Sequence, residues 1–354
     1  MKAKSWKTAK LGRLRGMGNY VHIAEDADNS SILVLGRSGS GKTYALQQIE
    51  KNIAEGGGMV LVLNFNSTHD FLNYGENQKV KRINIRAEGY PFPLFCPMIF
   101  PDGRREREED IVESILEIFG GVLPLPVRQK AELRMAVQQV VEHPEMWAQG
   151  IQAIRDLLMQ KEEEAAWRVY DKFYSLFSSV EFRQQEEKIF SSGQITILDL
   201  GDYAANVQHF IAEMTLAILY RYFCIWGRYA KQPLFVVLDE FQILRLTRNS
   251  ILAHILREGR KHNLAVLFAT QTLETFSKEQ VAVIRQAATQ LYFRPDEKCL
   301  KNLAREYTGE NWGNIREKVP SFQRGECIAV GRFETGTMEI RKPIMMTFRE
   351  KGGT

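Results

Sequence analysis

The residues Gly36-Arg37-Ser38-Gly39-Ser40-Gly41-Lys42-Thr43 fit the pattern Gly-x4-Gly-Lys-Thr, which is typical of a phosphate-binding loop. Glycine tolerates positive φ and lets the backbone approach phosphates closely, and backbone N–H groups at a helix N-terminus form an anion site. Lys42 would contact the β- and γ-phosphates, and the Thr43 hydroxyl would bind Mg²⁺. A glycine-rich turn with a chance lysine is the alternative. An apolar run before the loop and a helical pattern after it favour nucleotide binding. The predicted phosphate ligands are Gly36, Ser38, Gly39, Ser40, Gly41, Lys42 and Thr43.

Two acids, Asp239 and Glu240, follow the apolar run Leu234–Leu238. Ligands of parallel sheets bind at the carboxyl ends of the strands, so these acids should face the phosphates. Asp239 would hold Mg²⁺ through its water shell, and Glu240 would polarise the water that attacks the γ-phosphate. The alternative is a strand that simply ends in two solvated carboxylates.

A glutamine, Gln271, follows the apolar run Leu264–Ala269 and Thr270. At the end of a strand beside the Asp239 strand it could contact the γ-phosphate and report its presence, although an ordinary turn residue would look the same. Arg257, Arg260 and Lys261 precede the run. They are either a cationic helix end, which the helix dipole favours, or a source of an arginine finger for a neighbouring subunit. Their spacing leaves both open.

The elements that would position these residues alternate between strand and helix. The apolar runs Ser31–Leu35 and Met59–Leu63 flank the helical stretch Lys42–Glu55, so a parallel sheet in an α/β fold is expected. The other predicted strands are Gln194–Leu198, Leu234–Leu238, Leu264–Ala269, Gln290–Phe293 and Glu326–Val330.

A helical insertion is predicted between about residues 104 and 190. Its helical stretches are Glu106–Phe119, Val127–Val141, Ile151–Met159 and Glu164–Phe177. The expected organisation is a basic N-terminal segment (1–30), an ATPase domain (31–348) that contains the insertion, and a tail (349–354).

Composition suits a globular protein of 354 residues, with 44% hydrophobic and 25% charged residues and a net charge of +4. The four cysteines form no CxxC pair, which argues against a zinc site or disulfide scaffold and suits a reducing cytoplasm. The apolar stretch Phe210–Tyr229 contains Glu213, Arg221 and Arg228, so a buried helix explains it better than a membrane span. We therefore expect a cytoplasmic protein.

These motifs, in this order, resemble the HerA/FtsK branch of P-loop ATPases, and HerA-like translocases more than FtsK or conjugative coupling proteins. The most specific part is the combination of a Leu-Arg-Glu-Gly-Arg-Lys stretch and Thr270-Gln271 after the Asp239-Glu240 strand. The resemblance implies a RecA-like core, a hexameric ring, ATP with Mg²⁺, and ATP-driven movement along double-stranded DNA. It also makes Glu240 the catalytic glutamate, Gln271 the sensor and Arg260 the finger that acts on the next subunit, with Arg294 a second finger candidate.

The sequence departs from that family at two places. Asn64-Phe65-Asn66 stands where the family usually has an aspartate after the second strand. The family's N-terminal β-barrel is expected to be missing, since about 30 residues precede the first predicted strand. The role of Asn64-Phe65-Asn66 is open, whereas a core without the barrel favours a mobile-element, phage or defence context.

Three functions remain open. In the first, a motor contacts DNA phosphates without sequence specificity, through a cluster of cations at Arg245, Arg248, Arg257, Arg260 and Lys261. In the second, the ATPase ring is a scaffold that binds and switches an effector protein, such as a nuclease or NAD-consuming enzyme, through the basic N-terminus or the insertion. The third, a nucleotide kinase, leaves the acid pair and the basic stretch without a purpose.

Overall fold

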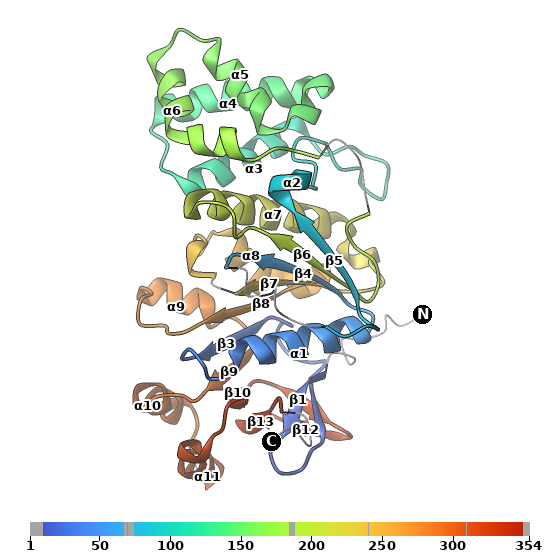
Figure 1. Cartoon of the computed structure of the whole chain (residues 1–354), viewed down its shortest axis with the longest axis vertical. Coiled ribbons are helices and arrows are strands. Elements are labelled where there is room, and N and C mark those ends of the chain that lie inside the picture. Colours follow the sequence, from blue (N-terminus) through green and yellow to red (C-terminus); the bar gives the residue numbers. More distant parts are fainter. Residues whose placement is uncertain are drawn as a thin grey trace.

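One 13-stranded sheet runs through the protein (Figure 1), in the order β12-β11-β2-β1-β13-β10-β9-β3-β8-β7-β4-β6-β5. The structure is a computed structural model and describes residues 10–66, 69, 74–183, 188–239, 241–308 and 310–349. Seven neighbouring strands, from β9 to β5, pair in parallel. They are β3 Ile32–Gly36, β4 Met59–Asn64, β5 Lys79–Asn84, β6 Gln194–Asp199, β7 Leu234–Asp239, β8 Leu264–Thr270 and β9 Thr289–Phe293.

Most of the parallel strands are continuous apolar runs because helices cover both faces of the sheet. The edge strand β5 is the exception, since it carries three cations and only Ile83 in it is buried. On one face, α1 Lys42–Glu55 packs on residues such as Val34 and Val237. On the other face, α7 Ala205–Trp226 and α8 Ile251–Glu258 pack on residues such as Leu33 and Leu238. The predicted α/β fold with mainly parallel core strands is confirmed.

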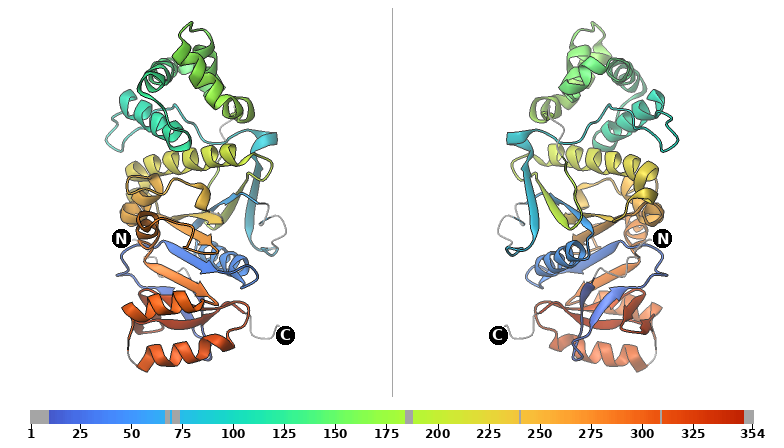
Figure 2. Two further views of the ribbon diagram at one scale, coloured as in Figure 1. Left: turned by 90° about the vertical axis from the view of Figure 1, so that its left-hand side faces the viewer. Right: turned by 90° about the vertical axis from the view of Figure 1, so that its right-hand side faces the viewer.

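The long helix α7 lies between the sheet and the helical insertion (Figure 2). Residues Ala205–Tyr229 are long and apolar enough to cross a membrane, but 72% of their most apolar window is buried inside the protein. The helix therefore has the burial of a core helix, as the charges within Phe210–Tyr229 indicate.

The helical insertion lies between β5 and β6 and forms one end of the molecule (Figure 1). The short helix α2 Ile85–Glu88 leads into it. Its four longer helices are α3 Glu108–Val122, α4 Val127–Glu142, α5 Ile151–Met159 and α6 Glu164–Ser179. The ring of Phe119 on α3 lies 5.0 Å from those of Phe173 on α6 and Phe210 on α7, so the insertion shares its core with the sheet domain.

The six remaining strands form an antiparallel extension of the sheet. They are β1 Lys10–Leu14, β2 Tyr20–Ile23, β10 Glu326–Val330, β11 Phe333–Thr335, β12 Met338–Ile340 and β13 Ile344–Thr347. The expectation that the first strand begins at Ser31 is therefore wrong. Part of the basic N-terminal segment is therefore strand, since Lys10 and Arg13 are half-buried in β1 beside the buried Leu11 and Leu14. Residues 1–9 lie outside the described part of the chain.

Three further helices follow the Gln271 region: α9 Lys278–Ile284, α10 Glu297–Glu306 and α11 Glu310–Lys318. Two 3₁₀ turns flank α8, and the second of them carries Arg260. They are η4 Phe241–Ile243, after β7, and η5 Gly259–His262, before β8.

Candidate nucleotide site

The predicted phosphate loop connects β3 to α1. Gly39 and Gly41 have φ values of 74° and 101°, a region that favours glycine, and Gly41 caps the N-terminus of α1. The Lys42 Nζ donates to the carbonyl oxygens of Gly36, at 2.5 Å, and Arg37, at 3.2 Å. The ammonium group of Lys42 therefore lies against the backbone of the phosphate loop, where it could contact a phosphate.

The phosphate loop also contacts the turn before β10. The Gly325 N–H donates to the Ser40 carbonyl at 2.9 Å, and a Cβ on Gly41 would lie 2.6 Å from the Gly325 nitrogen. Ser40 is buried, and its Oγ has no hydrogen-bond partner among the described residues. A close backbone cradle with an unpartnered hydroxyl fits a polar ligand such as a phosphate.

The carboxyl edge of the parallel sheet carries the other predicted side chains. In the registers, Leu35 on β3 is level with Thr270 on β8, and Ala269 on β8 with Asp239 on β7. Gln271, directly after β8, therefore follows the strand between the phosphate-loop strand and the Asp239 strand. Glu240 follows Asp239 in the chain but lies outside the described residues.

Arg294 follows β9, where Phe293 is level with Gly36 of the phosphate-loop strand. Its φ of 44° is unusual for a residue with a Cβ. Together with Gly36, Arg37 and Gln271 it lines a cavity of about 600 Å³. This position favours contact with a nucleotide of its own subunit over a role as a finger for a neighbour.

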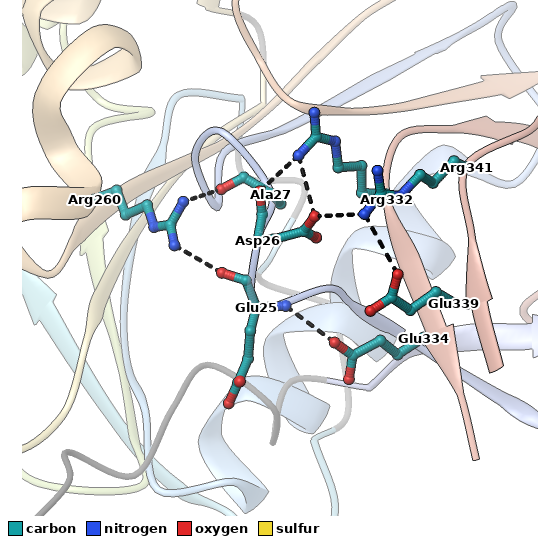
Figure 3. A network of polar contacts seen from close by, with 8 residues as sticks. All are labelled: Glu25, Asp26, Ala27, Arg260, Arg332, Glu334, Glu339 and Arg341. Carbon is teal, nitrogen blue, oxygen red and sulfur yellow. Dashed lines mark hydrogen bonds and ion pairs between the residues drawn. The ribbon is translucent and has the colours of Figure 1, made fainter. Parts of the chain in front are cut away.

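Arg260 lies at the opposite edge of the sheet, in η5, just before β8 begins. Since β8 has 7 residues, about 20 Å of strand separates it from the Gln271 end, at about 3.3 Å per residue. Its guanidinium donates to the carbonyl oxygens of Glu25, at 2.7 Å, and Ala27 (Figure 3). Arg260 therefore cannot reach the phosphate loop of its own subunit, and any part in ATP chemistry would require a neighbouring subunit.

The predicted cation cluster is divided between the two edges of the sheet. Arg245 and Arg248 follow β7 at the carboxyl edge, whereas Arg260 and Lys261 precede β8 at the amino edge. Arg257, in the last turn of α8, reaches back and donates to the Arg248 carbonyl at 2.8 Å. Proximity along the chain is misleading here because α8 crosses from one edge to the other. The expectation of a single basic patch is therefore wrong.

Asn64, which stands where the family usually has an aspartate, is buried beside Asp199 at the end of β6. Its Nδ2 donates to Asp199 Oδ1 at 2.8 Å, and its Oδ1 accepts from the His69 N–H at 3.3 Å. Arg82 lies 3.9 Å from Asp199. A carboxylate is thus present next to this position, supplied by a neighbouring strand. The sequence shows Asp199 at a strand end but not its pairing with Asn64.

A buried polar group behind α1 was not predicted. Glu50 on α1 accepts a hydrogen bond from the Tyr74 hydroxyl at 2.6 Å and contacts His69 Nε2 at 3.1 Å. Burial alone would lower the pKa of His69, but the charge of Glu50 and its hydrogen bond outweigh burial and raise that pKa overall. The available sequence signal is the carboxylate of Glu50 among the apolar positions of α1.

A second cavity, of about 500 Å³, lies beside the start of α1. Its lining residues are Gly41, Tyr44, Gln323, Arg324, Gly325 and Arg349. An aromatic ring and two arginines therefore line a space next to the phosphate loop that could hold the part of a nucleotide beyond its phosphates.

Comparison with known proteins places the chain in a family. The profile of the family described as "Helicase HerA, central domain" matches residues 9–219. Among solved structures, VirB4 of Thermoanaerobacter pseudethanolicus has a TM-score of 0.69 at 16% identity, over 98% of this chain and 97% of that one. The plasmid coupling protein TrwB in complex with ADP and Mg²⁺ has a TM-score of 0.62 at 12% identity, over 94% and 88%. At such identities the likeness shows the shared fold. No curated protein matches the chain.

The family match agrees with the phosphate-loop geometry and with the resemblance in the motifs, and it covers more than half of the chain. The protein belongs to the HerA central-domain family, within the HerA/FtsK-type P-loop ATPases.

Proposed function

We propose that this protein is an ATP-hydrolysing, ring-forming motor that moves double-stranded DNA. The observation that carries the proposal is the division of the site between two edges of one sheet. The phosphate loop, Asp239 and Gln271 lie at the carboxyl edge of the sheet, while Arg260 lies at its amino edge. A subunit so built has half of an ATP site at each edge.

In this proposal the ligands are ATP and Mg²⁺, and the solved complex of TrwB with ADP and Mg²⁺ supports this choice. The loop from Gly36 to Thr43 binds the phosphates, with Lys42 as their cation, and Thr43 and Asp239 hold the metal directly or through water. Mg²⁺ would neutralise charge on the phosphates. Glu240 orients and deprotonates the attacking water, and Gln271 detects the γ-phosphate.

The ring follows from the position of Arg260. A guanidinium that stabilises charge on a transferring phosphoryl group can be supplied by a neighbouring molecule. Joining the amino edge of one subunit to the carboxyl edge of the next is a head-to-tail contact, which closes into a ring when the rotation allows. We propose six subunits, as the family resemblance implies.

DNA would be contacted by the segment between β7 and α8, which carries Arg245 and Arg248. The segment begins just beyond Asp239, and its backbone is attached to α7 because the Arg245 N–H donates to the buried Glu213 carboxylate at 2.7 Å. The Arg248 side chain is 79% exposed. Because the segment begins next to the ATP site, a change at that site would move Arg245 and Arg248. Contacts of this kind bind phosphates, depend strongly on salt and carry no sequence information.

We further propose a cytoplasmic protein from a mobile-element, phage or defence context. A second candidate function is a regulatory ring that switches an effector protein, such as a nuclease. The exposed aromatic face of α6 favours it. Trp167 and Tyr174 are 56% and 55% exposed, and their rings lie 5.1 and 5.8 Å from that of Tyr170 between them. Exposed aromatic patches of this kind often contact proteins.

Displacement of a third strand from a DNA triplex tests the motor directly. We expect ATP-dependent displacement from duplex DNA of arbitrary sequence, and none with Glu240→Gln, which should still bind ATP. Displacement without ATP, or equal displacement by the Glu240→Gln variant, would exclude ATP-driven movement. If hydrolysis ignored DNA but responded to a co-purifying protein, the regulatory ring would be the better account.

A further inference from the structure

We propose that Asp26 is a positioning residue that fixes Arg260 for the ATP of the next subunit. This inference rests on the proposed function, in which Arg260 acts across a subunit interface. The loop between β2 and β3 carries Asp26 and lies directly against Arg260 at the amino edge of the sheet (Figure 3).

The carbonyl groups that hold Arg260 flank Asp26 in the chain. The guanidinium donates to the Glu25 carbonyl at 2.7 Å and also to the Ala27 carbonyl. Arginine has five N–H donors in a rigid plane, so two bonds set its direction and leave donors for a phosphate. Wherever residues 25–27 move, the guanidinium of Arg260 must follow or lose its bonds.

Asp26 attaches this loop to the antiparallel extension of the sheet. Its Oδ2 contacts Arg332, at 3.2 Å, and Arg341, at 3.1 Å, while its carbonyl accepts from Arg332 at 3.0 Å. The neighbouring Glu25 N–H donates to Glu334 at 3.1 Å. Figure 3 shows both guanidinium groups converging on the one carboxylate. Asp26 is therefore a side chain of the loop that binds it to the extension, in addition to the backbone bonds at Glu25 and Asp26.

The strand β10 connects this attachment to the phosphate loop of the same subunit. At its start, the Gly325 N–H donates to the Ser40 carbonyl of the phosphate loop at 2.9 Å. At its far end comes Arg332, whose carbonyl accepts from the Ala24 N–H at 2.9 Å. All five residues of β10 are buried. One short strand thus links the nucleotide loop of a subunit to the arginine that it presents to its neighbour.

The ion pairs of Asp26 with Arg332 and Arg341 contribute little to the stability of the fold. The side chains of Asp26, Arg332 and Arg341 are 46%, 42% and 63% exposed. Ion pairs this exposed to water add little to folding stability. Two cations on one carboxylate do fix its position. We infer that the network serves the direction of Arg260, so losing it should impair turnover more than folding.

The first test compares turnover with binding. Asp26→Ala should lower kcat by about 10-fold to 100-fold, the size expected from a small misplacement of a group that acts on the transition state. The KM for ATP and the urea midpoint of unfolding should stay near the wild-type values. Arg341→Gln, which removes one cation from Asp26, should give a smaller loss in the same direction. Asp28→Asn, which changes an exposed carboxylate of the same loop, should leave kcat unchanged.

A double variant separates positioning from a general defect. If Asp26 acts through Arg260, Asp26→Ala should cause no further loss in an Arg260→Ala background. An equal fold-loss in both backgrounds, or an unchanged kcat in Asp26→Ala, would overturn the proposal. If Arg260→Ala itself kept full turnover, the finger assigned in the proposed function would fail instead.

Mixing subunits of two different variants shows in which subunit the loss of turnover arises. Lys42→Ala subunits should lack nucleotide binding but offer an intact Arg260, so mixing them with Asp26→Ala subunits should restore part of the turnover. Arg260→Ala subunits should be rescued in the same way. Rescue of Arg260→Ala but not of Asp26→Ala would place the Asp26 defect within its own subunit and refute the proposal. Rescue of neither would count against the shared ATP site.

Discussion

Substitution of Gly41 by alanine tests whether the phosphate loop is built against the turn before β10. The new Cβ would lie 2.6 Å from the nitrogen and 3.0 Å from the Cα of Gly325. Both are backbone atoms, so the clash cannot be relieved by the movement of a flexible side chain. The substitution should therefore push Gly325 away from its hydrogen bond to the Ser40 carbonyl.

The expected cost has two parts. With φ at 101°, Gly41 adopts a conformation that costs a residue with a Cβ about 1–2 kcal/mol. Forcing extra volume into a packed contact typically costs about 1–3 kcal/mol. Gly41→Ala should therefore lower the free energy of unfolding by about 2–5 kcal/mol.

Gly39→Ala is the matched control. Gly39 has φ of 74° in the same loop, but a Cβ there would meet nothing within 4 Å. Gly39→Ala should therefore lower the free energy of unfolding only by the conformational part, about 1–2 kcal/mol. Urea unfolding without nucleotide measures both. Equal destabilisation by the two variants would refute the close contact with Gly325, and no destabilisation by either would refute the left-handed loop.

Two further predictions concern buried titratable groups. Burial, with the nearby charge of Asp296, raises the pKa of the Cys299 thiol to about 12, so iodoacetamide at pH 8 should label it far more slowly than the exposed Cys96; equal rates on peptide mapping would contradict this. The raised pKa of His69 means that its charged pair with Glu50 contributes stability below pH 6.5, which is lost as the pH rises through the raised value. The stability difference between the wild type and the double variant Glu50→Gln/His69→Gln should therefore shrink above pH 6.5 in urea unfolding, and a difference independent of pH would show that His69 is not charged in the folded protein.

The parallel core could be predicted from the sequence because its signals are local. Strands buried on both faces are continuous apolar runs, as in Leu234–Leu238, and the helices of the insertion show clear periodicity. The antiparallel extension could not. β1 pairs with β13 from the far end of the chain, where Arg13 lies opposite Thr347. Short strands that contain half-buried lysine and arginine show no such run, and no local pattern specifies a partner more than 300 residues away.

The candidate site divides in the same way. The phosphate loop and Asp239 follow from residue types in a short motif, and the structure brings them to one edge. Spacing along the chain places Arg248 and Arg260 in one cluster. In the structure α8 lies between them, so that they are at opposite edges of the sheet. The pairing of Asn64 with Asp199 depends on two strands meeting in register, which the sequence between them does not encode locally.

The rate of ATP hydrolysis with and without duplex DNA tests the central claim most directly. For a motor that contacts DNA phosphates near its ATP site, added duplex should raise the rate severalfold at low salt. The stimulation should decline steadily as salt increases, because counterions compete for the phosphates. The same rate with and without duplex at low salt, under conditions where the protein is assembled and binds ATP, would contradict the account.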